Sequence, residues 1–255
     1  MNKNLEKIIK VKYASAIYNI TSDTFTRQDV LYSIQKMNPD YHIGSFNRHF
    51  SKLLSLGCIE NIAENLYIKV TPDSLRKNYK NRASSAELIA IESFLESRFP
   101  LAEFLLFEII MLNEFLNHQI AQNTIIVTVE KMLIDAFFEE LSLEFPSVMI
   151  APRIEELSRY GNNGTIIIDK LQARYPKNSA QKHRYSIEKL LVDLFAEKLL
   201  KALLNPGDYP ALFEIAFKKY IINETRLFNY AKSRRVDTEI KVMIKKETNI
   251  KLFTR

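Results

Sequence analysis

The chain contains little cysteine and glycine, and these shortages exclude several kinds of site. Its single cysteine, Cys58, excludes a disulfide framework and a zinc site built on cysteines. The five glycines form no glycine-rich phosphate loop, and Gly161 and Gly164 in "YGNNGT" instead mark a turn. The four histidines are scattered and include no His-x-x-x-His pair of the kind that ligates a metal. We therefore expect neither a metal nor a cofactor.

Long apolar runs are missing as well. The start, "MNKNLEKIIKVKY", is charged throughout and lacks the apolar core of a signal peptide. The longest apolar runs, such as "FLLFEII", are too short to span a bilayer. These patterns predict a cytoplasmic protein with no membrane partner, and a single cysteine suits that reducing compartment.

The charge is distributed unevenly, although its net value is only +6. Residues 1–82 hold 13 Lys or Arg against 7 Asp or Glu, residues 83–144 hold 2 against 11, and residues 145–255 hold 21 against 12. This basic, acidic, basic order suggests separate surfaces for separate partners, and nucleic acid is the usual partner of a basic surface. The alternative is that the oppositely charged blocks face each other within the fold.

The first 70 residues have the pattern of three helices followed by a hairpin. The run "NLEKIIKVKYASAI" predicts an amphipathic first helix, and Thr26 with Asp29 predicts a capping box at the start of the second. The third helix is predicted to begin at Ser45 as N-cap and to turn Phe46 and Phe50 inward. Gly57 supplies its left-handed C-cap, and the β-prone runs "CIENI" and "LYIKV" follow.

This order predicts a winged helix-turn-helix that binds DNA, over residues 1–70. The outward face of the third helix carries Arg, Lys, Asn and Ser, which are the residue types that reach base edges and phosphates. The alternatives are a solvated polar face and a winged helix that binds another protein. The predicted DNA-binding residues are Thr26, Arg27, Ser45, Asn47, Arg48, Ser51, Lys52, Ser55 and Asn65.

The remaining residues predict a linker and a second domain. Residues 71–84 lack apolar periodicity and read as a basic linker, and Ser84 with Glu87 predicts a capping box just beyond it. Short β-branched runs then occupy residues 104–110, 124–129, 148–151 and 165–171.

An amphipathic helix separates the second of these runs from the third, with Met132, Ala136, Phe137 and Leu141 predicted to face inward. A strand, a helix and a strand with tight joints favour a parallel crossover. After Pro176 the pattern is helical almost to the end. We therefore predict an α+β protein: a winged helix-turn-helix, then a domain over residues 85–255 with a small four-stranded, mostly parallel sheet and a helical tail.

No catalytic constellation is apparent in the sequence, and we expect no enzyme activity. There is no Gly-x-Ser-x-Gly elbow, and no strand-borne pair of acids is followed by Glu-x-Lys as in a metal-dependent nuclease. Asp169 and Asp193 are the acids with the most apolar neighbours, and a capping or salt-bridge role is favoured for them over catalysis. A basic tail is either a solvated face or a docking surface for nucleic acid or an acidic protein; it consists of Lys232, Arg234, Arg235, Lys241, Lys245 and Lys246.

Several segments of the second half resemble a known family. These are "LNEFLNHQ", "VTVEKMLIDAFFEEL", "IIIDKL", "IEKLLVDL" and "KKYIINETRLFNYAKSRR", in this order behind the predicted DNA-binding domain. The chain thereby resembles the AbiEi-like antitoxins of type IV toxin–antitoxin systems, which serve in abortive infection.

The resemblance implies an antitoxin that binds inverted repeats in its own promoter, represses its own transcription and counters a co-encoded nucleotidyltransferase toxin. It does not imply direct contact with that toxin, and it leaves open whether the chain forms a homodimer on DNA. One rival hypothesis is a nuclease or other nucleic-acid-modifying enzyme that the winged helix directs to its target. Another is a ligand-responsive transcriptional regulator, which would carry a deep apolar pocket in its second half.

Overall fold

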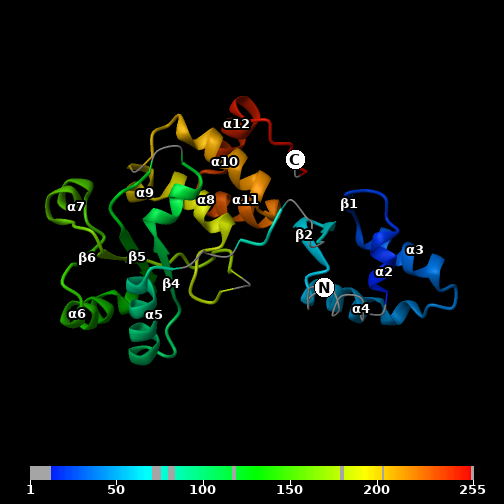
Figure 1. Cartoon of the computed structure of the whole chain (residues 1–255), viewed down its shortest axis with the longest axis horizontal. Coiled ribbons are helices and arrows are strands. Elements are labelled where there is room, and N and C mark those ends of the chain that lie inside the picture. The colour runs from blue at the N-terminus through cyan, green and yellow to red at the C-terminus, as the bar shows by residue number, and fades with distance from the viewer. Residues whose placement is uncertain are drawn as a thin grey trace. The chain divides into compact units, whose positions relative to one another are not determined.

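The protein divides into two compact units (Figure 1). The computed structural model describes residues 13–70, 76–79, 84–116, 119–178, 181–202 and 204–253. The first unit runs as far as Lys77 and also includes Ile221–Arg226 and Lys251–Arg255. The second unit contains Asn78–Tyr220 and Leu227–Ile250. Of the predicted linker, only residues 76–79 and 84 are described.

The first unit combines helices with a small antiparallel sheet. Its elements are α2 (Ala14–Tyr18), β1 (Thr24–Phe25), α3 (Arg27–Met37), the 3-10 turn η1 (Ile43–Ser45), α4 (Phe46–Ser55), β2 (Ile59–Ala63) and β3 (Leu66–Lys69). Strands β2 and β3 form the predicted hairpin, and β1 adds to the free edge of β3, which gives the order β1-β3-β2. Of the predicted first helix, residues up to 12 lie outside the described residues.

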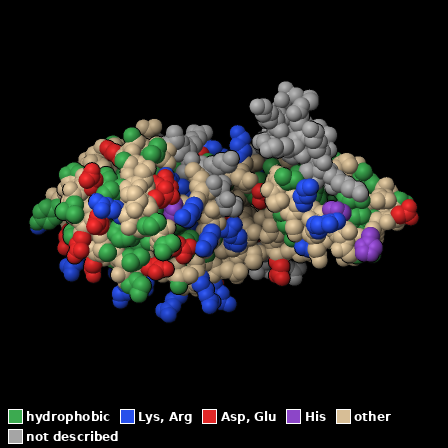
Figure 2. All heavy atoms as spheres, turned by 90° about the horizontal axis from the view of Figure 1, so that it is seen from below, with side chains coloured by type: hydrophobic (Ala, Val, Ile, Leu, Met, Phe, Trp, Pro, Cys, Tyr) green, Lys and Arg blue, Asp and Glu red, His purple; other side chains and the backbone are tan. Residues whose placement is uncertain are grey.

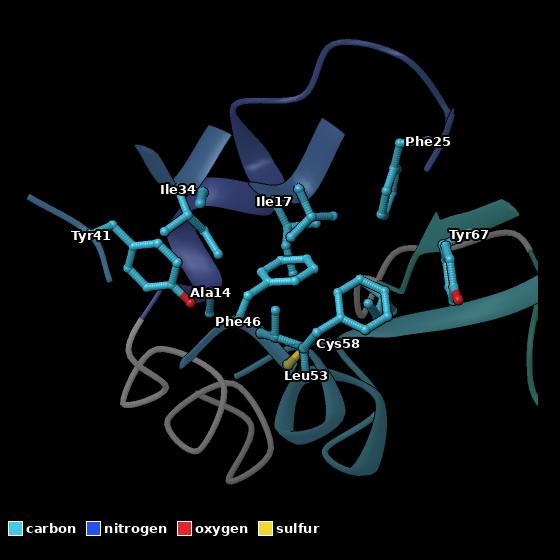
Figure 3. Close-up of a cluster of buried hydrophobic side chains, with 13 residues drawn as sticks. Ala14, Ile17, Phe25, Ile34, Tyr41, Phe46, Leu53, Cys58 and Tyr67 are labelled. Carbon is cyan, nitrogen blue, oxygen red and sulfur yellow. The ribbon is translucent and has the colours of Figure 1, made fainter. Parts of the chain in front are cut away.

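An aromatic-rich core holds this unit together (Figure 3). Phe50 on α4 is fully buried, and its ring meets Tyr67 of β3 edge-on with the centroids 4.9 Å apart. Phe46 packs beside it at 5.4 Å. Since burying one such side chain stabilises a fold by roughly 1.5–3 kcal/mol, the inward face of α4 ties that helix firmly to the hairpin. The sulfur of Cys58 lies in the same core, as a small apolar group.

Two of the three predicted helix ends in this unit are confirmed. Thr26 and Asp29 form a capping box at the start of α3, and Gly57 adopts a φ of 67° beyond α4. The predicted N-cap role of Ser45 is wrong, because Ser45 ends the turn η1 in a helical conformation and its side chain makes no capping hydrogen bond.

The second unit is built on a four-stranded mixed sheet. Its first part comprises α5 (Ala86–Arg98), β4 (Phe104–Glu108), η2 (Ile109–Glu114), β5 (Thr124–Val129), η3 (Lys131–Leu133), α6 (Ile134–Glu144), β6 (Val148–Ile150), α7 (Ile154–Tyr160) and β7 (Thr165–Lys170). The strand order is β4-β5-β7-β6. The pairs β5–β7 and β6–β7 are parallel and β4–β5 is antiparallel, so the predicted four-stranded, mostly parallel sheet is confirmed.

Helices cover the sheet. Apolar side chains of β4, β5 and β7 form one core cluster with α5 and α6. Residues that alternate with them along the strands point to the opposite face, where Phe107 stacks on Tyr185 just ahead of α8. The predicted helical tail is confirmed: α8 (Ile187–Ala196), α9 (Lys198–Ala202), α10 (Asp208–Lys219), α11 (Glu224–Ser233) and α12 (Asp237–Glu247). No helix within the described residues is long and apolar enough to cross a membrane.

Two details of the second unit differ from the prediction. The N-cap of α5 is Ser85, whose hydroxyl accepts from the backbone N–H of Leu88, so the predicted capping box at Ser84 is wrong. The predicted inward orientation of Met132 is also wrong, because its side chain is 82% exposed. It lies in the 3-10 turn η3, where three residues per turn change the phase of the helical pattern before α6 begins.

Candidate nucleic-acid interface

The exposed face of α4 presents a polar stripe. Arg48, Ser51, Lys52 and Ser55 are exposed and recur every three or four residues, which places them along one side of the helix. Figure 2 shows Lys, Arg and His side chains close together on the visible face of the first unit. Arg48 and Lys52 form no ion pair with any described residue, so both cations remain available to an external partner.

Arg27, at the first position of α3, links three elements of the first unit. Its guanidinium lies 4.5 Å from the centroid of the Phe50 ring and donates to the Asn47 side chain over 2.6 Å. Its backbone N–H donates to the side-chain oxygen of Asn65, in the hairpin turn, over 3.3 Å. These contacts fix the start of α3 relative to α4 and the hairpin. Sequence reasoning missed these links, because Arg27 is 20 residues from Asn47 and 38 from Asn65.

The other residues predicted to bind DNA also have local structural roles. The Thr26 hydroxyl donates to the Asp29 carboxylate over 2.8 Å, in the capping box. Asn65 adopts a φ of 51°, as a tight turn requires, and Asn tolerates this left-handed region better than most residues. Ser45 is half-buried at the junction of η1 and α4. The structure thus groups the predicted residues around α4 and the hairpin turn, with Arg48, Ser51, Lys52 and Ser55 the most accessible.

Two tyrosines, Tyr13 and Tyr41, pack against His49, the residue of α4 that follows Arg48. The hydroxyl of Tyr41 lies 2.9 Å from Nδ1 of His49, and the Tyr13 ring meets that of Tyr41 edge-on at 5.1 Å. Burial raises the pKa of Tyr41, Tyr13 adds to this, and the positive charge of Arg48 acts in the opposite direction. Tyr41 is therefore neutral at physiological pH, so it places no negative charge near Arg48.

The second unit contains a buried ion network centred on Asp193, a residue of α8. Asp193 is 0% exposed, and its carboxylate accepts from Lys189, from the hydroxyl of Tyr230 at 2.8 Å and from Arg234 at 2.9 Å. Arg234 also reaches Glu197 over 2.6 Å. Asp193 therefore has the salt-bridge role that the sequence favoured. Only the spacing of Lys189 and Asp193, one turn apart in an apolar helix, could have indicated this network.

The electrostatics of this network favour its ionised form. Burial alone would lower the pKa of Arg234, but Asp193, Tyr230 and Glu197 together raise it above its ordinary value. Burial raises the pKa of Tyr230, and the charge of Asp193 adds to this effect. Arg234 therefore stays charged and Tyr230 keeps its proton, which is the state in which both donate to Asp193.

The other members of the predicted basic tail lie at the surface. Lys232, Arg235, Lys245 and Lys246 are exposed, whereas Arg234 is held in the buried network. Lys241 lies over the ring of Phe228, with Nζ 5.0 Å from the ring centroid. The part of the chain that the structure describes offers no group of three His, Cys, Asp or Glu side chains that could hold a metal.

Comparisons with known proteins identify the family of the chain. A search of curated proteins finds no significant match. Among solved structures, the RV2827C protein from Mycobacterium tuberculosis matches over 94% of this chain and 81% of its own, at 12% identity and a TM-score of 0.27. A score that low does not establish a common fold. A family model matches residues 45–250, most of the chain. The chain therefore belongs to the DUF6577 family, a family of unknown function.

Proposed function

We propose that the protein is a DNA-binding repressor of its own promoter and the antitoxin of a type IV toxin–antitoxin pair. In this proposal the first unit is a winged helix, with α4 as the helix that enters the major groove and the β2–β3 hairpin as the wing. The observation that carries it is the exposed pair Arg48 and Lys52, one turn apart on α4 and without an ion-pair partner among the described residues.

The order of elements in the first unit supports this assignment. A helix, a short strand, two helices and a hairpin, with the short strand paired to the hairpin, is the arrangement expected of a winged helix. The core residues of α4 and the contacts of Arg27 hold the polar stripe outward. A rigid helix with outward Arg and Lys side chains suits a major groove, where such groups bind guanine edges and phosphates.

Footprinting of the full chain on the DNA upstream of its own reading frame tests the first part of the proposal. We expect protection of a short inverted repeat, with each half-site covered by one copy of the chain. Unrelated DNA of equal length and base composition serves as the control. Equal affinity for the promoter and the unrelated DNA at the same salt concentration would overturn the assignment as a sequence-specific repressor.

The antitoxin role rests on the resemblance of the second-half segments to AbiEi-like antitoxins. Its test is co-expression with a nucleotidyltransferase encoded in the neighbouring reading frame. We expect the full chain to restore growth. When each form of the chain is expressed from a foreign promoter, we expect the Arg48→Ala/Lys52→Ala variant to restore growth equally. Failure of the full chain to protect cells would refute the antitoxin role while leaving the repressor role standing.

The structure gives less support to the two rivals. Of the two acids singled out in the sequence, Asp193 does not suit the nuclease hypothesis, because its carboxylate is fully buried and already accepts from three side chains. The ligand-responsive regulator calls for a deep apolar pocket in the second unit. A hollow of about 510 Å³ beside β4 is open and has Glu103, Lys177 and Lys182 in its lining, which does not favour that hypothesis.

A further inference from the structure

The hairpin of α11 and α12 in the second unit carries a row of lysines. Lys241 and Lys245 are one turn apart on α12, and therefore on the same side of that helix. Lys241 lies over the ring of Phe228 on α11, and Lys232 follows Phe228 by one turn. Because Phe228 connects the two helices at this point, Lys232, Lys241 and Lys245 form one basic stripe across them.

The stripe has no ion-pair partner among the described residues. Glu239, an acid in the first turn of α12, is already paired with Lys201 on α9, at 3.4 Å. Asp237 lies in the same turn, where a carboxylate interacts favourably with the helix dipole. Lysines spaced four residues apart repel each other, so the stripe does not stabilise the helix that carries it. Arg234, by contrast, is a cation of the same unit that is paired, with Asp193 and Glu197.

We propose that this stripe binds the phosphate backbone of double-stranded DNA, as a second contact in addition to that of α4. Flexible lysines with unpaired ammonium groups suit phosphates, which are evenly spaced and need no fixed geometry. A protein partner would be expected to require an apolar centre, and the stripe itself is built of lysines. This proposal rests on the proposed function, because the stripe would contact DNA that α4 already binds. Binding at α4 would keep the flanking DNA at a high local concentration near the second unit.

The test uses the full chain and two duplexes, one limited to the inverted repeat and one extended by about three helical turns on each side. The variant is Lys232→Gln/Lys241→Gln/Lys245→Gln, in which the long side chains remain and the charges are removed. The matched control is Lys131→Gln/Lys170→Gln/Lys182→Gln, three exposed lysines elsewhere in the second unit. Fluorescence anisotropy gives the affinity of each protein for each duplex over a series of salt concentrations.

We expect the stripe variant to bind the short duplex like the parent. On the extended duplex its slope of log affinity against log salt should be shallower by about 0.9 for each phosphate that the variant no longer neutralises. The control variant should retain the parental slope. If the stripe and control variants have the same slope on the extended duplex, the proposal is wrong, and a stripe that serves a protein partner would give this result.

A second arm separates failure of the stripe from failure of α4. In the Arg48→Ala/Lys52→Ala background, site-specific binding should disappear, and weak, salt-sensitive binding to any long duplex should remain. Adding the three stripe substitutions should abolish that remainder. Specific binding that survives removal of the Arg48 and Lys52 side chains refutes the proposed function of α4. A remainder that survives the stripe substitutions refutes the stripe alone.

Discussion

Removal of the negative charge of Asp193 should strongly destabilise the second unit. The substitution Asp193→Asn keeps the shape of the side chain but leaves Lys189, which is 2% exposed, without a counter-ion. Arg234 retains Glu197 at 2.6 Å. Loss of one partner from a buried ion pair costs about 3–5 kcal/mol, and we expect the lower end of this range because Arg234 stays paired. That is a large part of a typical unfolding free energy of about 5–15 kcal/mol.

Urea unfolding followed by circular dichroism measures this loss. With a slope of about 2 kcal/mol per molar urea, a loss of about 3 kcal/mol lowers the midpoint by about 1.5 M. Glu103→Gln is the control, since it breaks an ion pair with Lys177 whose side chains are 44% and 74% exposed, and such pairs are worth about 0–1 kcal/mol. The variant Lys189→Met/Asp193→Leu removes both charges and should recover part of the loss. A midpoint for Asp193→Asn equal to that of the Glu103→Gln control would refute the argument.

Three further predictions concern single positions. Gly57→Ala should destabilise the first unit by about 1–2 kcal/mol through its φ of 67° alone, because nothing lies within 4 Å of an added Cβ; thermal unfolding measures it, and no change in Tm would contradict it. Burial raises the pKa of the Cys58 thiol, so an aromatic disulfide reagent at pH 8 should label the native chain slowly and the urea-unfolded chain fast, and equal rates would show that the thiol is accessible. Hydrogen bonds from Lys177 and Tyr175 lower the pKa of Glu103, so its small stabilising contribution is present above pH 4.5 and is lost as the pH falls through the lowered value. Glu103→Gln should therefore flatten the fall of Tm in that acid range, and an unchanged profile would contradict the assignment.

Local signals in the sequence predicted most of the fold. The capping box at Thr26 and the glycine at position 57 depend only on near neighbours, and both appear in the structure as predicted. The strand segments were recognisable because their β-branched runs are short and apolar. A cap prediction failed where tertiary contacts intervened: Ser84 accepts from Arg184, a residue 100 positions away, and Ser85 caps α5 instead.

Interactions between residues that are far apart in the sequence could not be predicted from it. The pairing of Asp193 with Arg234 joins residues 41 positions apart, and the sequence placed Arg234 with the surface lysines. The links of Arg27 to Asn47 and Asn65 likewise depend on how the helices and the hairpin pack. The exposed stripe of α4 was predictable because helical periodicity alone separates it from the buried Phe46 and Phe50.

The central claim is that α4 binds DNA, and the affinity of the Arg48→Ala/Lys52→Ala variant for the chain's own promoter tests it most directly. The matched control is Lys131→Ala/Lys182→Ala, which removes two exposed charges from the second unit. Removal of a base contact should weaken promoter binding by about 1–3 kcal/mol, while removal of a phosphate contact should weaken binding to all sequences alike. Circular dichroism should show an intact fold, since neither α4 side chain is buried. We predict that the folded α4 variant no longer retards a short duplex limited to the inverted repeat of the promoter and that the control still does, and normal retardation by the α4 variant would contradict the account.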